Sequence, residues 1–186
     1  MTFLSLFLTF VILQRIFELY IAKKNAVYIE SLGGFEVGQK HYPFIVMLHI
    51  TFLLSVYIES SDLTFLPTWW PIPFTIFILA QGMRFWTMAS LGRFWNTRIY
   101  ILPNSKPIHK GPYQFIRHPN YLIVMVEIIT IPLIFGAYYS AILFPILNTL
   151  LLTIRIKVEE KALSTCTSYK EEMETIPRFF PQKNNQ

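Results

Sequence analysis

Long apolar stretches constrain the fold of this chain more than any other feature of its sequence. Residues 2–22, 42–59 and 70–90 are mostly apolar, and a helix needs about 20 such residues to cross the hydrocarbon core of a bilayer. Hydrophobic residues make up 53% of the 186-residue chain and charged residues only 15%, which is too apolar for a soluble domain of this length. The sequence therefore predicts a helical protein that lies in a lipid bilayer.

A fourth apolar region, from Tyr121 to Ile154, predicts a helical hairpin. Pro132, Gly136 and residues 137–140 interrupt it near its middle, as a turn requires. Each arm would hold about 15 residues and extend roughly 22 Å, which is short for a full crossing. The expected fold is an all-α integral membrane protein with about five transmembrane helices, of which the C-terminal hairpin supplies two.

The chain shows no repeat, low-complexity tract or change in composition that would divide it, so we expect a single domain over residues 1–186. Residues 1–60 would form its N-terminal helices. The N-terminus lacks the basic segment and cleavage site of a signal peptide and is expected to remain as the first helix. Cys166 is the only cysteine, which excludes an intrachain disulfide.

The distribution of Lys and Arg predicts how the chain is oriented in the cell membrane. Basic residues follow the first span, the third span and the hairpin, at Lys23, Lys24, Lys40, Arg93, Arg98, Lys106, Lys110, Arg117 and from Arg155 to Lys183. The connections at 59–68 and 136–140 contain none. The positive-inside rule then places the N-terminus outside and the C-terminus in the cytosol. Because the basic residues form short clusters between apolar runs, the net charge of +5 does not indicate nucleic-acid binding.

Residues 111–121 are the densest group of polar and special residues, and they lie directly before the hairpin. Pro119 disfavours helical geometry at His118 and can itself begin the next helix. His118 would then lie at a bend close to helix-start N–H groups, where a carboxylate can bind. The alternative is that Arg117 and His118 are only interfacial anchors.

A second polar group follows the hairpin, at residues 155–160. Arg155 and Glu159 are spaced i, i+4 and share one face of a helix, whereas Glu160 lies about 100° around it. A solvated helix with a surface ion pair would show the same spacing. The hairpin returns the chain to the surface from which it entered, so both polar groups should meet there.

Four charged residues fall inside the predicted spans, namely Arg15, Glu18, Arg84 and Glu127. Charges in a membrane usually pair, and we expect a structural role for all four. Arg15 and Glu18 are spaced i, i+3 and can neutralise each other, while Arg84 should extend to the inner surface. The histidines at 41, 49 and 109 show no metal-ligand spacing with one another or with the cysteine, so no metal site is expected.

The polar groups occur in an order that is similar to a known family. Gly-Pro-Tyr-x-x-x-Arg-His-Pro-x-Tyr (111–121), the hairpin, Arg-x-x-x-Glu-Glu (155–160) and Ile-Pro-Arg-Phe-Phe-Pro (176–181) resemble the isoprenylcysteine carboxyl methyltransferase family. The resemblance covers residues 70–181, which would be the catalytic region. Residues 14–25 resemble the N-terminal helix of bacterial members more loosely. The resemblance implies methyl transfer from S-adenosylmethionine at a cytosolic site.

Carried over to this chain, the resemblance implies a cofactor pocket formed by Lys106, Pro107, Ile108, His109, Tyr113, His118, Pro119, Asn120, Tyr121 and Glu159. Arg155 would face the acceptor as the catalytic residue. The acceptor would be an amphiphilic small molecule that enters from the bilayer. Residues 169–177 depart from the family pattern, so the C-terminal lid is expected to differ.

Two acceptors and two other functions remain open at this point. The resemblance points toward family members that O-methylate long-chain alkylpyrones made by type III polyketide synthases, and a prenylated cysteine carboxylate is the alternative acceptor. A membrane reductase of the steroid-reductase type would use NADPH, and a scaffold would bind neither cofactor. Residues 33–38 are rich in glycine but lie between membrane helices, which excludes the nucleotide-binding fold of soluble methyltransferases.

Overall fold

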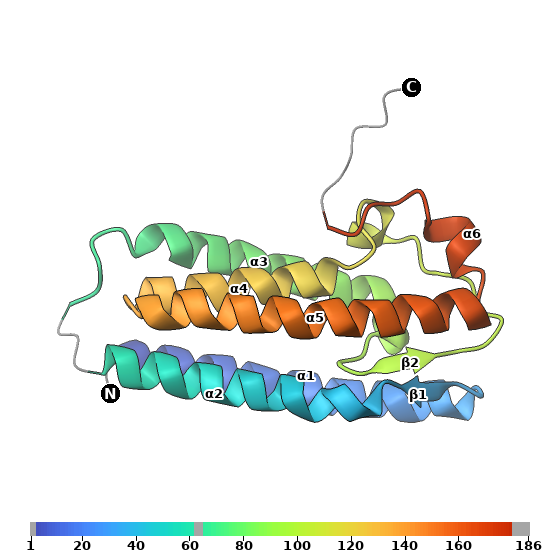
Figure 1. Ribbon diagram of the computed structural model, residues 1–186, viewed down its shortest axis with the longest axis horizontal. Helices are drawn as coiled ribbons and strands as arrows, with labels where there is room; N and C mark the ends of the chain where they lie inside the picture. Colours follow the sequence, from blue (N-terminus) through green and yellow to red (C-terminus); the bar gives the residue numbers. More distant parts are fainter. Residues whose placement is uncertain (1–2, 62–64, 180–186) are drawn as a thin grey trace, which may run out of the picture.

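The computed structural model describes residues 3–61 and 65–179 (Figure 1). Its α-helices are α1 (Phe3–Ser31), α2 (Tyr42–Ser60), α3 (Pro71–Leu91), α4 (Pro119–Ile134), α5 (Tyr138–Cys166) and α6 (Tyr169–Met173). Two strands, β1 (Phe35–Val37) and β2 (Ile99–Ile101), and the 3-10 turns η1 (Gln39–His41), η2 (Gly92–Phe94) and η3 (Gly111–Gln114) connect them. The predicted all-α membrane fold is confirmed.

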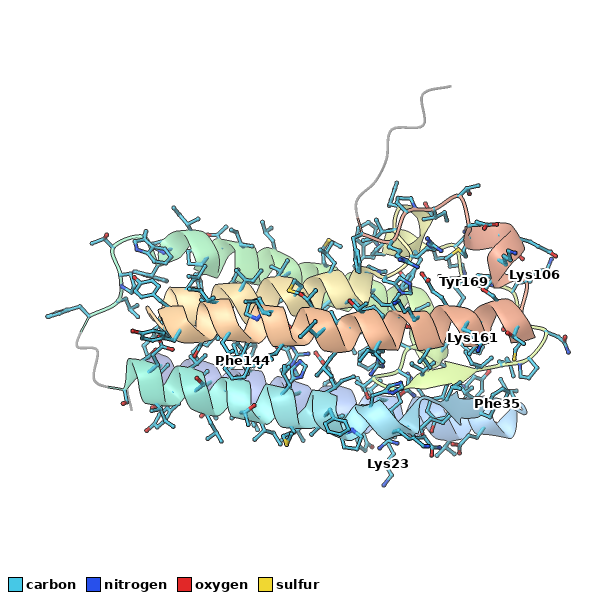
Figure 2. The ribbon with its side chains drawn as sticks, in the orientation of Figure 1. Lys23, Phe35, Lys106, Phe144, Lys161 and Tyr169 are labelled. Atoms are coloured by element: carbon cyan, nitrogen blue, oxygen red, sulfur yellow. The ribbon has the colours of Figure 1, made fainter. Side chains whose placement is uncertain are left out.

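The long helices form two layers (Figure 1). Helices α1 and α2 lie side by side in one layer, and α3, α4 and α5 make up the other. Aromatic side chains join the layers: Phe7 packs on Phe77 with ring centroids 5.0 Å apart, and Phe52 packs on Phe144 at 5.3 Å. Figure 2 shows Phe144 between α5 and α2. These contacts hold the layers together in the half of the molecule that contains the N-terminus.

The outward faces of the helices are apolar, as a lipid environment requires. Large exposed side chains include Phe10, Leu13, Phe17, Met47, Leu79, Phe85, Ile142 and Leu150. Among the described residues, three helical segments are long and apolar enough to cross a membrane, namely Phe3–Ser31, Gln39–Ser60 and Tyr138–Cys166. Helix α3 has the predicted bounds to within one residue at each end but is not one of these three. A crossing by α3 stays a prediction.

The hairpin is confirmed, but the expected length of its second arm was wrong. Helix α4 has 16 residues, close to the prediction, and the turn follows at Gly136, whose φ is 72°. Helix α5 has 29 residues because the segment beyond Ile154 is rich in helix-favouring Lys, Glu, Ala and Leu. At 1.5 Å per residue it is roughly 43 Å long. One unbroken helix therefore runs from the turn to residues 155–160.

A two-stranded sheet at the end opposite the N-terminus was not predicted. Strand β1 pairs antiparallel with β2, and Glu36 lies opposite Tyr100. Arg98 donates to Glu36 at 2.9 Å, and the Tyr100 hydroxyl donates to Glu30 at 3.0 Å. The glycine-rich residues 33–38 thus form a turn and a strand. The sheet joins the loop after α1 to the loop after α3. The end of the molecule that contains this sheet, η3 and α6 is its polar end.

The four intramembrane charges meet in one buried ionic cluster, consisting of Arg15, Glu18, Arg84 and Glu127. The predicted pairing of Arg15 with Glu18 is confirmed at 2.7 Å. The expectation that Arg84 reaches the surface was wrong: its side chain is 2% exposed, and it donates to Glu18 at 3.2 Å and to both carboxylate oxygens of Glu127. Two carboxylates from neighbouring helices lie within its reach, so pairing replaces extension to water.

Candidate functional site

A cavity of about 830 Å³ lies between the two layers and extends to the polar end. Its size is within the range of small-molecule sites. One part is lined by polar residues, namely Tyr113, His118, Asn120, Tyr121, Arg155 and Glu159. The rest is lined mainly by apolar side chains of α1 and α2, including Leu8, Ile12, Ile16, Ile50, Leu53 and Leu54, and also by His49 and by Arg15, Glu18 and Arg84 of the buried ionic cluster. The cavity therefore matches an amphiphile with a polar head and an apolar chain.

The loop before α4 is held against α3 by a close approach at Gly111. Its φ is 54°, and a Cβ atom there would lie 2.1 Å from Ser90 Oγ and 2.8 Å from Trp86 Nε1. Only glycine fits this conformation and this space. The approach places η3 so that Tyr113 is buried at the cavity. Burial, and next the Glu159 carboxylate, raise the pKa of Tyr113, so its hydroxyl stays protonated as a donor.

His118 lies at the predicted bend. It is the residue before α4, with φ −125° and ψ 57°, and Pro119 begins the helix. Its ring is buried and stacks on Tyr121, with centroids 5.3 Å apart. The carboxylate that His118 contacts here belongs to the protein itself, since Nε2 lies 3.0 Å from Glu160 Oε1. The bend thus fixes the His118 ring between the cavity and α5.

The C-terminal segment fastens this loop, an interaction that sequence reasoning missed. The backbone N–H of Arg117 donates to Pro177 O at 2.9 Å, and that of His118 donates to Arg178 O at 3.1 Å. Arg178 also donates through Nε and Nη2 to Glu160, at 3.0 and 2.6 Å. The Ile-Pro-Arg part of the C-terminal motif, residues 176–178, was the feature of the sequence that could have indicated this contact. Phe180 and Pro181 of that motif lie outside the described residues.

Arg155, Tyr121 and Glu159 form a hydrogen-bonded row along the cavity wall. The Tyr121 hydroxyl donates to Glu159 Oε2 and accepts from Arg155 Nε at 2.8 Å. Arg155 Nη2 donates to the backbone oxygen of Thr97 at 2.6 Å. Arg155 Nη1 donates no hydrogen bond to another described residue. The i, i+4 spacing thus puts both charged side chains on the cavity, with one guanidinium nitrogen available to a ligand.

Residues 106–109 do not line this cavity, which differs from the expected cofactor pocket. Pro107, Ile108 and His109 line a second hollow of about 440 Å³ together with the C-terminal end of α3. Lys106 lies near α6 at the polar end (Figure 2). After β2 the chain passes the C-terminal end of α5, where the Asn104 N–H donates to Cys166 O at 2.9 Å, and then α6, where His109 Nε2 lies 3.4 Å from a carboxylate oxygen of Glu172. Leu91 and Phe94 line both hollows, which are therefore adjacent.

Residues 95–98 line the cavity and were not predicted. Helix α1 fixes them: Asn25 Nδ2 donates to Trp95 O at 2.7 Å, and Asn96 Nδ2 donates to Ala22 O at 2.9 Å. The aromatic and polar residues 93–98, shortly after the predicted span 70–90, could have indicated this wall of the cavity.

Four buried polar atoms of cavity-lining residues have no hydrogen-bond partner among the described residues, namely Trp95 Nε1, Arg117 Nε, Asn120 Oδ1 and Asn148 Nδ2. Buried polar groups are normally paired. Unpaired donors and an unpaired acceptor therefore indicate a site for a polar ligand.

Comparisons with known proteins agree with the order of these elements. The profile of the isoprenylcysteine carboxyl methyltransferase family matches residues 72–165. The uncharacterized protein YpbQ of Bacillus subtilis is 39% identical over 159 residues, which cover 85% of this chain and 95% of the relative. An uncharacterized protein of Haemophilus influenzae is 28% identical over 167 residues, or 88% and 96% of the two chains. With the loop, the hairpin and residues 155–160 all inside the matched range, the chain belongs to the isoprenylcysteine carboxyl methyltransferase family.

Proposed function

We propose that this protein transfers a methyl group from S-adenosylmethionine to an oxygen atom of a lipid-like acceptor. The family consists of membrane methyltransferases that use this cofactor. The observation that carries the proposal is the cavity, which is polar around Arg155 and Glu159 and apolar along α1 and α2. A site of this kind receives a soluble cofactor at one end and an apolar chain at the other.

The polar residues fit the chemical groups of the cofactor. S-Adenosylmethionine carries a sulfonium, an ammonium, a carboxylate and an adenine ring. Glu159 supplies an anion for the positive charges, and the ring of Tyr113 supplies a face for the sulfonium or the adenine, while the ring of Tyr121 already stacks on His118. The unpaired Trp95 Nε1 and Asn120 Oδ1 add a donor and an acceptor. His118 and Pro119 shape the loop that carries these groups.

Arg155 has the acceptor-positioning role in this proposal. When bound, the cofactor would supply a methyl group on a positively charged sulfur, which an oxygen lone pair can attack in line. Arg155 Nη1 donates to that oxygen and holds its lone pair toward the cofactor. The apolar walls exclude water, so charge attraction within the site is strong. No side chain needs to accept a proton if the acceptor oxygen arrives ionised.

A long-chain alkylpyrone is the acceptor that we propose. The hydroxyl on its pyrone ring ionises readily to an oxyanion that suits Arg155, and its alkyl chain suits the apolar wall formed by Ile12, Ile16 and Ile50. A prenylated cysteine, whose carboxylate would occupy the same place, fits the family as the alternative acceptor.

Ligand titration of the purified protein tests the proposed function. We expect S-adenosylhomocysteine to bind and NADPH to give no signal. Binding of NADPH alone would support a reductase, and binding of neither would support a scaffold. Lipid extracts from cells with and without the gene then identify the acceptor, because its product is heavier by one methyl group in place of one hydrogen.

Replacing Arg155 with lysine should reduce kcat/KM by about 10-fold to 100-fold, roughly 1.4 to 2.8 kcal/mol. Lysine keeps the charge but cannot bond Tyr121, Thr97 and an acceptor oxygen together through a planar guanidinium. Steady-state kinetics and S-adenosylhomocysteine titration separate turnover from cofactor affinity, which should change little. Arg93→Lys, at the same end but away from the cavity, is the matched control. Wild-type turnover in Arg155→Lys would leave Arg155 with only an anchoring role.

We propose that the N-terminus lies outside the cell and the polar end lies in the cytosol. Single cysteines placed in a Cys166→Ser background test this orientation. A cysteine at Ser61 should react with an impermeant maleimide in intact cells, whereas one at Ser105 or Gln182 should react only after permeabilisation. Labelling of Gln182→Cys in intact cells would reverse the topology and separate the site from its cytosolic cofactor.

A further inference from the structure

Four residues form one stripe on α5 that faces the cavity. Asn148, Leu152, Arg155 and Glu159 are spaced i, i+4, i+7 and i+11, and all four line the cavity. This spacing keeps side chains on a single helix face. The stripe is polar at the end that holds the proposed methyl-transfer site and apolar at Leu152, and then becomes polar again at Asn148. That second polar position lies inside the membrane, and the proposed function does not explain it.

Asn148 is buried without a hydrogen-bond partner. Its side chain is 2% exposed, and Nδ2 has no partner among the described residues. A buried polar group in this condition normally indicates a missing partner. Because Asn148 lines the cavity, that partner would lie in the cavity.

His49 of α2 lies opposite Asn148 across the cavity. The rings of Phe52 and Phe144 are in contact between the same two helices. His49 precedes Phe52 by three residues and Asn148 follows Phe144 by four, so each lies one turn from that contact toward the polar end. Both residues line the cavity. Helix geometry thus places the imidazole and the amide at the same depth.

The two side chains offer complementary hydrogen-bonding atoms. His49 Nδ1 lies 2.7 Å from the backbone oxygen of Ile45, which can only accept, so Nδ1 carries the proton. In the neutral ring Nε2 is then an acceptor. Asn148 Nδ2 is a donor. A hydroxyl is the smallest organic group that can both donate to His49 Nε2 and accept from Asn148 Nδ2.

We infer that His49 and Asn148 bind a hydroxyl group on the chain of the acceptor, so that the proposed alkylpyrone carries a hydroxylated rather than a plain alkyl chain. The inference rests on the proposed function for the place of the head group. Asn148 precedes Arg155 by seven residues, which is roughly 10 Å along α5. The hydroxyl therefore lies about that far from the oxygen that Arg155 holds.

Binding of two simple probes tests this inference without turnover. Stearic acid and a hydroxystearic acid with its hydroxyl roughly 10 Å from the carboxylate are titrated against the full-length protein in nanodiscs. The carboxylate of each probe takes the place of the acceptor oxygen at Arg155. We expect the wild type to bind the hydroxylated acid about tenfold more tightly, the effect of one net hydrogen bond.

Variants identify the residues responsible. The preference should disappear in Asn148→Leu, which keeps the number and branching of the side-chain heavy atoms but removes the donor, and fall in His49→Leu. It should persist in Thr149→Leu, because the neighbouring residue is exposed and does not line the cavity. Equal affinities in the wild type would overturn the inference, as would a preference that survives Asn148→Leu.

The same samples distinguish this failure from failure of the proposed function. S-Adenosylhomocysteine binding without discrimination between the acids rejects the hydroxyl site alone. Discrimination that depends on Asn148, without S-adenosylhomocysteine binding, supports the hydroxyl site and rejects the methyltransferase.

Discussion

Replacing Arg84 with methionine should lower the free energy of unfolding by about 3 to 5 kcal/mol, the usual cost of removing one partner from a buried ion pair. Arg84 is 2% exposed and contacts both carboxylates of the buried ionic cluster. Without it, Arg15 is the only cation among the described residues that pairs with Glu18 and Glu127, and its side chain is 27% exposed. One negative charge in the bilayer interior is then left without compensation.

Reversible unfolding in mixed micelles, followed by circular dichroism, measures this loss. Arg93→Met is the control, because it removes an arginine of the same chain outside the cluster. Adding Glu127→Leu to Arg84→Met should recover part of the stability, since the unpaired carboxylate is removed with its partner. If Arg84→Met unfolds at the same denaturant concentration as the wild type, the cluster does not hold the two layers together.

Replacing Glu159 with glutamine should weaken S-adenosylhomocysteine binding by about 1.5 to 3 kcal/mol, or roughly 10-fold to 150-fold, because a hydrogen bond to a charged group is lost. Glutamine can still accept from the Tyr121 hydroxyl through its amide oxygen, so the wall of the cavity should remain intact. The change therefore removes the negative charge and little else.

Isothermal titration calorimetry of the purified variant measures the affinity. Glu171→Gln makes the same charge change at an exposed position of α6 and should bind like the wild type. An unchanged affinity in Glu159→Gln would remove Glu159 from the cofactor site and leave its bond to Tyr121 as its only role.

Local patterns in the sequence predicted the parts of the site that depend on local geometry. Pro119 after His118 predicted the bend, and the i, i+4 spacing put Arg155 and Glu159 on one face of a helix. The predicted hairpin brought the loop at residues 111–121 and the polar group at residues 155–160 to the same end of the molecule. In each case the signal lies within a few residues of the structure that it specifies, so no knowledge of other helices was needed.

The features that sequence reasoning missed depend on neighbours far away in the chain. Arg84 was expected to reach water because its partners Glu18 and Glu127 lie on other helices. The wall at Trp95 exists because Asn25 of α1 binds its backbone oxygen. Residues 106–109 were assigned to the cofactor pocket by resemblance; Pro107, Ile108 and His109 line the neighbouring hollow, and their place in the cofactor site stays a prediction.

The continuity of α5 has a consequence for how this protein can diverge. Because one helix carries Asn148, Arg155 and Glu159, the distances and angles between these three side chains are fixed by helix geometry. A single residue inserted between them would rotate the side chains on one side of the insertion by about 100°, away from the cavity. Relatives that use another acceptor should therefore differ at this face of α5 by substitutions and not by insertions. The opposite wall, on α1 and α2, can change to fit an acceptor chain of another length or shape while α5 stays the same.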